Sequence, residues 1–546
     1  NMLRQESLEH KAHFTLSPIT EAELKRLIKA MNGKSAPGTD GICHTIIETY
    51  FDFIKHPIIH IINSSLEFST FPNIWKIAKV IPLHKGGSTV ELTNFRPISL
   101  LSILSKLLEK WVKHQLNSYL ENHTLISARQ FGFTPGVGVE EAHYTLTKDL
   151  YEVMDKKSNG ILVLIDLAKC FDSIDRDRLI SALQRHGIVG RELSWFKSYL
   201  SDRNQLVSID GGESDLLPVD FGVIQGSTLG PDLFRVFIND IAKIPIRGKL
   251  YLFADDAAFL FDHSSWQEVF TRANEDMNKI CLWLNSQSLT INVNKSKYLL
   301  FSRTRDKDSH PHKLKLHFCN SGYMACECSE IERVKSAQYL GLVLDENLDW
   351  KAQINALVKK TRKFVHIFYT IRNCFTKSTL ILLYKALVQS VLSFGILWWG
   401  NAYSSVLEPI TVLQKAILKV LLKKPRRFPS AELFHEAKVF TVKQLYIKHA
   451  LLYYHKHPET LDATTPSSSE QSTRTMRLTT QAVIPIPSSR LQTTSRHFYH
   501  NLPYILRTIP TTLVHPHSFS RSAYKKSVFS YLVATSPSEC DAMTSS

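Results

Sequence analysis

Two adjacent aspartates, Asp255 and Asp256, stand in an otherwise apolar run of the chain, LYLFADDAAFLF (250–261). Bringing two like charges together in an apolar setting is costly unless a cation neutralises them. A divalent metal ion is the simplest neutraliser. The order strand, Asp-Asp, strand is typical of a tight hairpin that presents both carboxylates at its tip. The run therefore predicts a metal-binding turn between two buried strands.

A second source of oxygen ligands occurs earlier, in LVLIDLAKCFDSID (162–175). Asp166 is predicted to end a buried strand, a usual place for a functional group. Two metal ions held by Asp166, Asp255 and Asp256, roughly 3.5 to 4 Å apart, fit phosphoryl or nucleotidyl transfer. The acids that follow occur where a turn leads into a helix, and we interpret them as structural caps: Asp172, Asp175 and Asp177.

The charge of the chain indicates a polyanionic partner. The 546 residues include 66 Lys and Arg against 50 acids, and the stretch from Lys351 to Ala450 alone has 17 basic residues against three acids. Clustered positive charge commonly binds nucleic acid, although a solvated surface is the simpler alternative. One basic cluster also fits a nuclear-entry signal: Lys423, Lys424, Arg426 and Arg427.

The length predicts three or four domains or subdomains, at about 100–200 residues per domain. Residues 75–345 mix strand and helix patterns, whereas the periodicity from Trp350 to Leu422 is almost purely helical. A Ser/Thr-rich segment, 464–480, is predicted to be a linker. The apolar run ALVQSVLSFGILWW (386–399) is shorter than the ~20 residues that cross a bilayer, so we expect a buried helix and no membrane association.

The eight cysteines are scattered, and the chain shows no signal peptide. This usage fits a reduced intracellular protein, of the cytoplasm and nucleus. Cys319, Cys326 and Cys328 cluster in CNSGYMACEC without a second cysteine pair or a histidine at finger spacing, which argues against a zinc site.

Six segments occur in the order and rough spacing of reverse transcriptase motifs: NFRPISLLS, LVLIDLAKCFD, GVIQGSTLGP, LFADDAAFL, LTINVNKSKYLLF and QYLGLVLD. In detail they resemble those of LINE-type, non-long-terminal-repeat retrotransposons, on the Jockey-like side. The resemblance covers about 34–400.

This resemblance implies an α+β right-hand polymerase fold, with fingers, a palm built on an antiparallel sheet, a helical thumb and a mostly helical C-terminal module. The implied division is an N-terminal helical extension at 1–70, fingers and palm at 71–348, the thumb at 349–428 and the C-terminal region at 429–546.

The resemblance implies RNA-directed DNA polymerase activity and roles for the acids. Asp166 matches the metal-binding aspartate of the palm, with the Leu167 carbonyl as a further ligand. Asp255 matches the second ligand and Asp256 the auxiliary acid. The implied cofactor is a pair of Mg²⁺ ions, with Mn²⁺ as the alternative. The implied partners are an RNA template, a DNA primer, their RNA–DNA hybrid and deoxynucleoside triphosphates.

Phe171 falls where family members pack a ring against the sugar of the incoming nucleotide. A bulky ring there excludes a 2′-hydroxyl, so deoxynucleotides are expected to be preferred; a plain core role is the alternative. Viral RNA polymerases of similar palm have an aspartate at this position. Gln225 and Gly226 resemble the motif beneath the nascent base pair, where glycine permits close backbone approach and the amide can reach a sugar or base edge.

Three basic residues are implied to contact the triphosphate. Arg96 resembles the fingers arginine, whose planar fork binds phosphate oxygens in pairs. Lys85 adds charge there, or is a solvated lysine before a Gly-Gly turn. Lys295 stands at the place of a lysine proposed to protonate the leaving pyrophosphate, with Lys297 or a plain surface role as alternatives.

The segment QYLGLVLD resembles the hairpin that grips the primer end, and the basic helices after Trp350 resemble a thumb along the hybrid. Three departures stand out. Cys170 replaces the usual alanine, which is expected to make the site sensitive to oxidation. Within these 546 residues we expect no endonuclease domain before the polymerase region, and no ribonuclease H acid cluster or terminal zinc knuckle after it. Two other hypotheses stay open: a catalytically inactive remnant that binds RNA or RNA–DNA hybrid, and a group II intron maturase-like protein.

Overall fold

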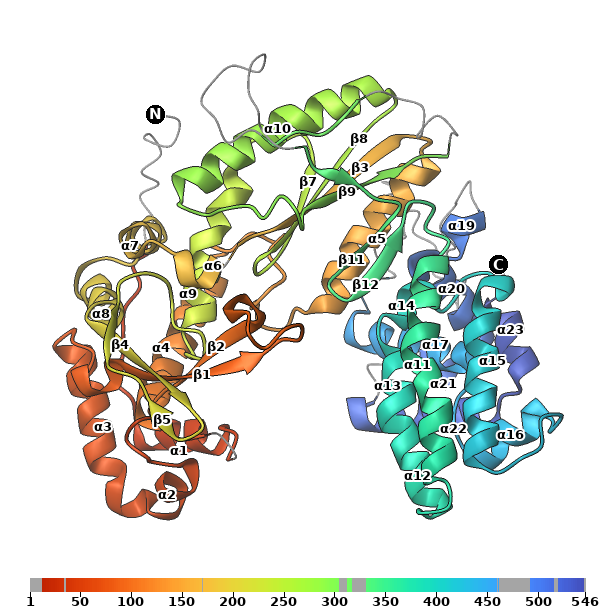
Figure 1. Cartoon of the computed structure of the whole chain (residues 1–546), viewed down its shortest axis with the longest axis horizontal. Helices are drawn as coiled ribbons and strands as arrows, with labels where there is room; N and C mark the ends of the chain where they lie inside the picture. The colour runs from red at the N-terminus through yellow and green to blue at the C-terminus, as the bar shows by residue number, and fades with distance from the viewer. Residues whose placement is uncertain are drawn as a thin grey trace, which may run out of the picture.

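The computed structural model describes residues 12–33, 36–168, 170–303, 312–316, 330–458, 460, 492–514 and 519–544. Figure 1 shows that they form an arch: a leg with a small sheet, a crown with a second sheet, and a leg made of helices. The predicted linker at 464–480 and the cysteine cluster at 319–328 lie outside the described residues. Within the described ranges, no helix is both long and apolar enough to cross a bilayer.

The first leg combines a mixed sheet with helices. Its strand order is β2-β1-β4-β5, with β6 also paired to β4. β1 is antiparallel to β2 and parallel to β4. The N-terminal helix begins at the predicted capping box, because Thr20 accepts from the Glu23 N–H and Glu23 accepts from the Thr20 N–H. The bounds are α1 Glu21–Lys29, α2 His44–Thr49, α3 Phe51–Glu67, β1 Ile77–His84, β2 Phe95–Leu100, α8 Gly190–Leu200, β4 Arg203–Ile209, β5 Gly212–Glu213 and β6 Leu217–Val219.

The crown is built on a second sheet of order β10-β9-β3-β8-β7. Its central strand β3 is antiparallel to both β8 and β9. Side chains alternate across β3, so Ile161 and Val163 join a core with α10, while Leu162 joins the core on the α5 side. The bounds are α5 Val139–Asp155, β3 Asn159–Asp166, β7 Lys249–Phe253, β8 Asp256–His263, α10 Trp266–Ser286, β9 Lys297–Phe301 and β10 Glu332–Arg333.

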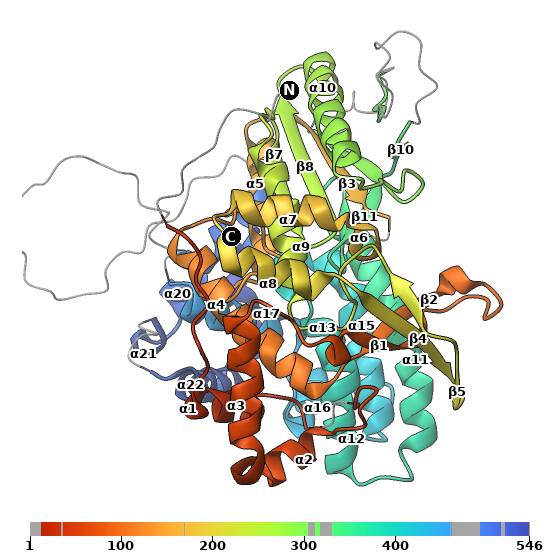
Figure 2. The same ribbon diagram turned by 90° about the vertical axis from the view of Figure 1, so that its left-hand side faces the viewer.

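Four helices connect the first leg to the crown. Figures 1 and 2 both place α6 and α9 next to each other beside the second sheet. The N-cap of α7 is Asp175, whose carboxylate accepts from the N–H groups of Asp177 and Arg178, as the sequence predicted. The bounds are α4 Ile103–Asn122, α6 Cys170–Ser173, α7 Arg176–Arg185 and α9 Gly230–Asn239.

The helical leg follows a small hairpin, β11-β12, and shares one core with the α5 face of the second sheet. That core includes Leu162 of the sheet, Trp398, Ile447 and Val528. The bounds are β11 Ser336–Tyr339, β12 Leu342–Asp345, α11 Lys351–Ile371, α12 Lys377–Tyr384, α13 Ser390–Ser393, α14 Ile396–Trp399, α15 Ser404–Leu421, α16 Ser430–Ala437, α17 Val442–Lys456, α19 Gln492–Ser495, α20 Phe498–Thr508, α21 Thr511–Val514, α22 Arg521–Ala534 and α23 Pro537–Thr544.

The run 386–399 was predicted to be one buried helix, and this prediction is wrong in part. The run begins in a π-helix, Lys385–Gln389, that joins α12 to α13 without a break, and it ends in the short helix α14. The chain leaves helical geometry between α13 and α14, at Phe394 and Gly395. Gly395 takes a left-handed φ of 62°, which ends the first helix and redirects the second. The last turn is buried as expected, since Trp398 and Trp399 are almost fully enclosed.

Candidate active site

The paired aspartates lie at the tip of the predicted hairpin. Strands β7 and β8 are antiparallel, and Phe253 pairs with Asp256, so Ala254 and Asp255 form a two-residue turn. Ala254 takes a left-handed φ of 57°, which suits such a turn. The turn leaves both carboxylates exposed to solvent while the strands beneath it are buried.

Asp166 ends β3 directly beside this tip. In the antiparallel register of β3 and β8, Asp166 is the partner of Asp256. Directly opposite residues of such a pair share a face, with Cβ atoms about 5 Å apart. The register therefore places Asp166 next to Asp256, the residue expected to be the auxiliary acid. As placed, no group of three or more Asp, Glu, His or Cys side chains among the described residues is arranged to hold a metal ion.

The electrostatics of these acids indicate mutual repulsion, which the nearby basic side chains offset only in part. Partial removal from water raises the pKa of Asp255, the charge of Asp166 raises it further, and Arg96 lowers it. The pKa of Asp256 rises from 3.8 to about 6, first through loss of hydration and then through repulsion by Asp255 and Asp166. Exposed carboxylate oxygens that repel one another are a donor set that fits a divalent cation.

The pKa of Asp256 predicts how stability depends on pH in the presence of a chelator. A carboxyl whose folded pKa is raised binds protons more strongly when folded, so its ionisation costs stability as pH rises through about 6. Asp256→Asn removes this cost. We expect the variant to unfold roughly 1 °C above the wild type at pH 7.5, an effect kept small by solvent exposure, and to show no difference near pH 4.

Thermal unfolding in EDTA across this pH range measures the difference. Asp262→Asn is the control, because Asp262 is an exposed acid near the opposite end of the same strand. A variant Asp256→Asn that is less stable than the wild type at pH 7.5 would contradict the repulsion.

The segment before β9 fixes the backbone of Asp166. The Asn292 N–H donates to the Asp166 carbonyl at 2.8 Å, and the Asp166 N–H donates to the Ser296 hydroxyl at 3.2 Å. The Ser296 hydroxyl in turn donates to the Asn292 carbonyl at 2.8 Å. Neither support was predicted from the sequence, although Asn292 and Ser296 both lie within the motif LTINVNKSKYLLF.

The two candidate lysines have different neighbours. The Lys295 Nζ lies 3.8 Å from Asp166 Oδ2, and the Lys295 side chain is mostly exposed. The Lys297 Nζ instead lies 3.4 Å from the carboxylate of Glu332, in the adjacent strand β10. Of the two, Lys295 is therefore the lysine beside the acids.

Phe171 follows Asp166 in α6 and is half-buried. Its ring stacks on Phe234 of α9, with centroids 4.6 Å apart and planes at 23°. Phe133 meets it edge-on, at 6.1 Å and 90°. Part of the Phe171 ring is therefore packed in the core, as the alternative interpretation expected. The rest of the ring is exposed and can contact a substrate.

The loop of Gln225 and Gly226 is fastened to β2. The Ser99 N–H donates to the Gln225 carbonyl at 2.8 Å. Gly226 has a φ of 119°, and a Cβ there would lie 2.3 Å from the Ser99 carbonyl oxygen, so only glycine fits. The Gln225 side chain donates to Asp172 Oδ1 at 2.8 Å, which gives Asp172 a role other than the cap expected from the sequence.

The two cationic candidates on the first sheet are exposed. Arg96 lies on β2 and is close enough to Asp255 to lower the pKa of that acid. Lys85 lies in the connection between β1 and β2, where its N–H donates to the Asn94 carbonyl at 2.8 Å. Arg96 therefore acts electrostatically on the acids. For Lys85, the structure gives a backbone hydrogen bond within its turn and no interaction with the acids among the described residues.

Cys170 is buried. Burial raises the pKa of its thiol most, and the negative charge of Asp255 raises that pKa further. Because the thiolate is the reactive form, a protonated thiol resists oxidation. The expected oxidation sensitivity at this position is therefore not supported.

Glu109 is a fully buried carboxylate that the sequence analysis missed. Its Oε2 accepts from the N–H groups of Thr228 at 2.6 Å and Leu229 at 3.1 Å, and its Oε1 accepts from the Ser105 hydroxyl at 2.9 Å. It therefore holds the loop that follows Gly226. In the sequence it looks like any polar residue of an amphipathic helix.

Glu109→Ala is expected to lower the free energy of unfolding by about 3 kcal/mol, because it leaves buried N–H donors without their charged acceptor. Urea unfolding measures the loss. Glu121→Ala is the control, since Glu121 is exposed on the same helix and its removal should change stability by less than about 0.5 kcal/mol. Equal effects of the two substitutions would show that the buried carboxylate does not support the loop.

Residues 83–344 match the family model described as reverse transcriptase (RNA-dependent DNA polymerase). The chain is 28% identical over 470 residues to a protein named probable RNA-directed DNA polymerase from transposon BS of Drosophila melanogaster, covering 82% of this chain and 50% of the relative. It is 26% identical over 510 residues to the RNA-directed DNA polymerase from mobile element jockey of the same species, covering 90% and 53%.

A third relative, the probable RNA-directed DNA polymerase from transposon X-element of Drosophila melanogaster, is 23% identical over 447 residues, which cover 80% of this chain and 48% of the relative. The chain thus spans about half the length of the curated relatives it matches. Residues 83–344 are therefore similar to reverse transcriptases, and these relatives are named RNA-directed DNA polymerases of transposons or mobile elements.

Proposed function

We propose that this protein extends a DNA primer on an RNA template, using deoxynucleoside triphosphates. The observation that carries the proposal is the register of β3 and β8, which places Asp166 opposite Asp256. Both residues lie at the strand ends next to the turn that contains Asp255. The half-buried Asp166, the exposed Asp255 and Asp256, and the half-buried ring of Phe171 suit a site where a nucleotide and a primer end meet. The raised pKa values of Asp255 and Asp256 fit the same site.

In this proposal Asp166, Asp255, Asp256 and the Leu167 carbonyl hold two Mg²⁺ ions, with Mn²⁺ as the alternative. When bound, these ions neutralise the triphosphate and favour ionisation of the attacking hydroxyl. The primer 3′-hydroxyl attacks the α-phosphate, and the bond to the leaving pyrophosphate breaks. The carboxylates would hold such ions where β3 ends and β8 begins.

The other candidate residues bind and orient the substrate. Arg96, with Lys85, binds the triphosphate from the first sheet, since a guanidinium pairs with phosphate oxygens. Lys295, 3.8 Å from Asp166, is positioned to give a proton to the departing pyrophosphate. Phe171 excludes a 2′-hydroxyl. The remaining two candidates, Gln225 and Gly226, support the nascent base pair.

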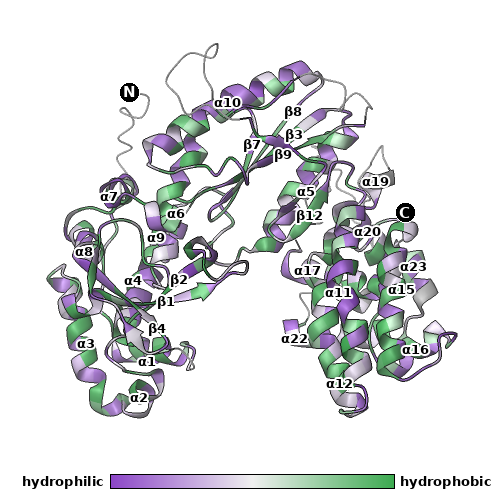
Figure 3. Cartoon of the chain, in the orientation of Figure 1, coloured by the Kyte–Doolittle hydropathy of each residue, from purple (hydrophilic) through white to green (hydrophobic). Residues whose placement is uncertain are grey.

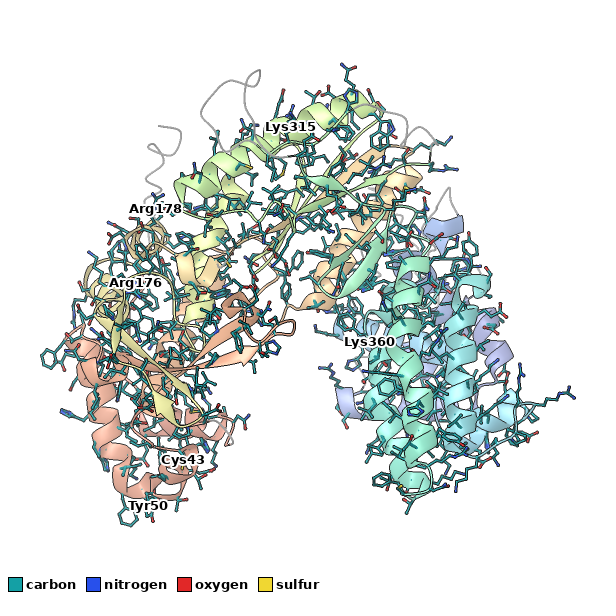
Figure 4. All side chains as sticks on the ribbon, in the orientation of Figure 1. Cys43, Tyr50, Arg176, Arg178, Lys315 and Lys360 are labelled. Atoms are coloured by element: carbon teal, nitrogen blue, oxygen red, sulfur yellow. The ribbon has the colours of Figure 1, made fainter. Side chains whose placement is uncertain are left out.

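The first leg would serve as the fingers, the crown as the palm and the helical leg as the thumb. The 21 residues of α11 include no acid, and Lys359, Lys360, Arg362 and Lys363 are all exposed. Figure 3 shows hydrophilic residues along α11, and Figure 4 places Lys360 on the side toward the first leg. Such a surface suits the phosphate backbone of an RNA–DNA hybrid. We also propose that the protein acts inside the cell, in the cytoplasm and the nucleus.

A primer-extension assay tests the function. Purified protein is given poly-rA, an oligo-dT primer, Mg²⁺ and dTTP, and the product length is measured. The proposal expects extension that stops in EDTA. A folded protein that binds the hybrid without extending the primer would instead be the inactive binding remnant.

A further inference from the structure

Three aromatic rings, which we name the gate cluster, surround the proposed sugar gate: Phe133, Phe171 and Phe234. Phe234 is fully buried and stacks on Phe171 from α9. Phe133 meets Phe171 edge-on at 6.1 Å, and 42% of its surface is exposed. The Phe171 ring therefore lies between the buried Phe234 and the partly exposed Phe133.

The backbone of Phe133 is held in an unusual conformation. Its φ is 56°, in the left-handed region that bulky residues rarely adopt. Its carbonyl accepts from Nη1 of Arg235 at 2.9 Å, and Arg235 is almost fully buried next to Phe234 on the same helix. The neighbouring Thr134 hydroxyl donates to the Gln130 carbonyl at 2.8 Å. Strain that the surroundings maintain in this way is a common feature of functional positions.

The segment that ends at Phe133 also touches the acid hairpin. The Leu252 N–H donates to the Arg129 carbonyl at 2.9 Å, and the Phe131 N–H donates to the Leu252 carbonyl at 2.8 Å, so the segment continues the sheet beyond β7. A Cβ at Gly132 would lie 2.2 Å from the backbone nitrogen of Ala254. Residues 129–133 thus connect the turn of Asp255 to the gate cluster through backbone contacts.

We propose that Phe133 is a positioning residue for sugar selection. Its edge keeps the Phe171 ring at a fixed place relative to the acid turn, so that the ribose of a nucleoside triphosphate meets a rigid surface. The inference rests on the proposed function, because it requires Phe171 to act as the sugar gate. Phe133 acts through Phe171 and has no need to touch the nucleotide itself.

The test compares kcat/KM for dATP and ATP on a poly-rU template with an oligo-dA primer, since these nucleotides differ only in the 2′-hydroxyl. Phe133→Leu is expected to raise the ATP-to-dATP ratio by about five- to tenfold, the scale of one edge-to-face ring contact. The change should appear as a lower KM for ATP, with kcat for dATP nearly unchanged. Phe133→Tyr keeps the ring and should keep the wild-type ratio.

Two further variants separate the possible failures. Phe171→Val tests the gate: if it admits ATP while Phe133→Leu leaves the ratio unchanged, the inference is overturned and the proposed function stands. If Phe171→Val does not alter selectivity, the gate itself is wrong and the inference fails with it. Phe53→Leu is the control for a lost surface ring, because Phe53 is 83% exposed on α3. If Phe133→Leu does not fold, Phe133→Met replaces it with the same expected result.

Discussion

Replacing Asp255 by Asn is expected to lower the rate of primer extension by about 1,000-fold. The substitution removes one negative charge from the turn while keeping the shape of the side chain. Loss of one metal-binding carboxylate is expected to remove several kcal/mol of transition-state stabilisation, and each 1.4 kcal/mol is about tenfold in rate. Because the turn itself depends on the β7-β8 register and not on this charge, the fold should persist.

Single-turnover primer extension measures this effect, with hybrid affinity measured in parallel. Affinity should change little, since the exposed basic residues of α11 lie on the helical leg and Asp255 lies on the crown. Asp262→Asn is the matched control, an exposed acid near the other end of β8 that pairs with Gly160. Near-wild-type extension by Asp255→Asn would refute its role as a metal ligand.

The second large effect is expected from Phe171→Val, which should raise the use of ribonucleotides relative to deoxynucleotides by about 100-fold. Valine removes most of the ring that would meet a 2′-hydroxyl, and small steric differences in a site are worth about 10- to 200-fold in discrimination. The buried partner Phe234 remains in place, so the site should keep its other walls.

Incorporation of ATP and dATP, measured separately, gives the ratio. Phe53→Val is the control, because it removes an exposed ring from α3 without altering the gate cluster. Unchanged sugar discrimination in Phe171→Val would remove this residue from the nucleotide site, and would return it to the core role that its stacking on Phe234 also allows.

The hairpin that contains Asp255 and Asp256 could be predicted from the sequence, because the interactions that determine it are between residues close together in the chain. Two charges inside an apolar run require a turn at that point, and Asp255 and Asp256 are found in and beside that turn. Asp166 at a strand end was likewise predictable from a run of β-branched and apolar residues. Which acid lies opposite Asp166 depends on the register of two strands about 90 residues apart, and only the structure gives it.

Other parts of the site depend on tertiary contacts that leave little trace in the sequence. Glu109 follows the spacing of an ordinary surface position, yet the loop after Gly226 buries it completely. The left-handed φ of Phe133 has no local signature, and the carbonyl of Phe133 accepts a hydrogen bond from Arg235, about 100 residues away. The break at Gly395 was visible as a glycine, but the length of the apolar run concealed its effect.

The binding of Mn²⁺ to the protein–hybrid complex, followed by electron paramagnetic resonance, tests the central claim that Asp166, Asp255 and Asp256 together form a divalent-metal site. The wild type is predicted to bind two Mn²⁺ ions, whereas Asp255→Asn should bind at most one with comparable affinity. Equal numbers and affinities of bound Mn²⁺ in both proteins would contradict the account.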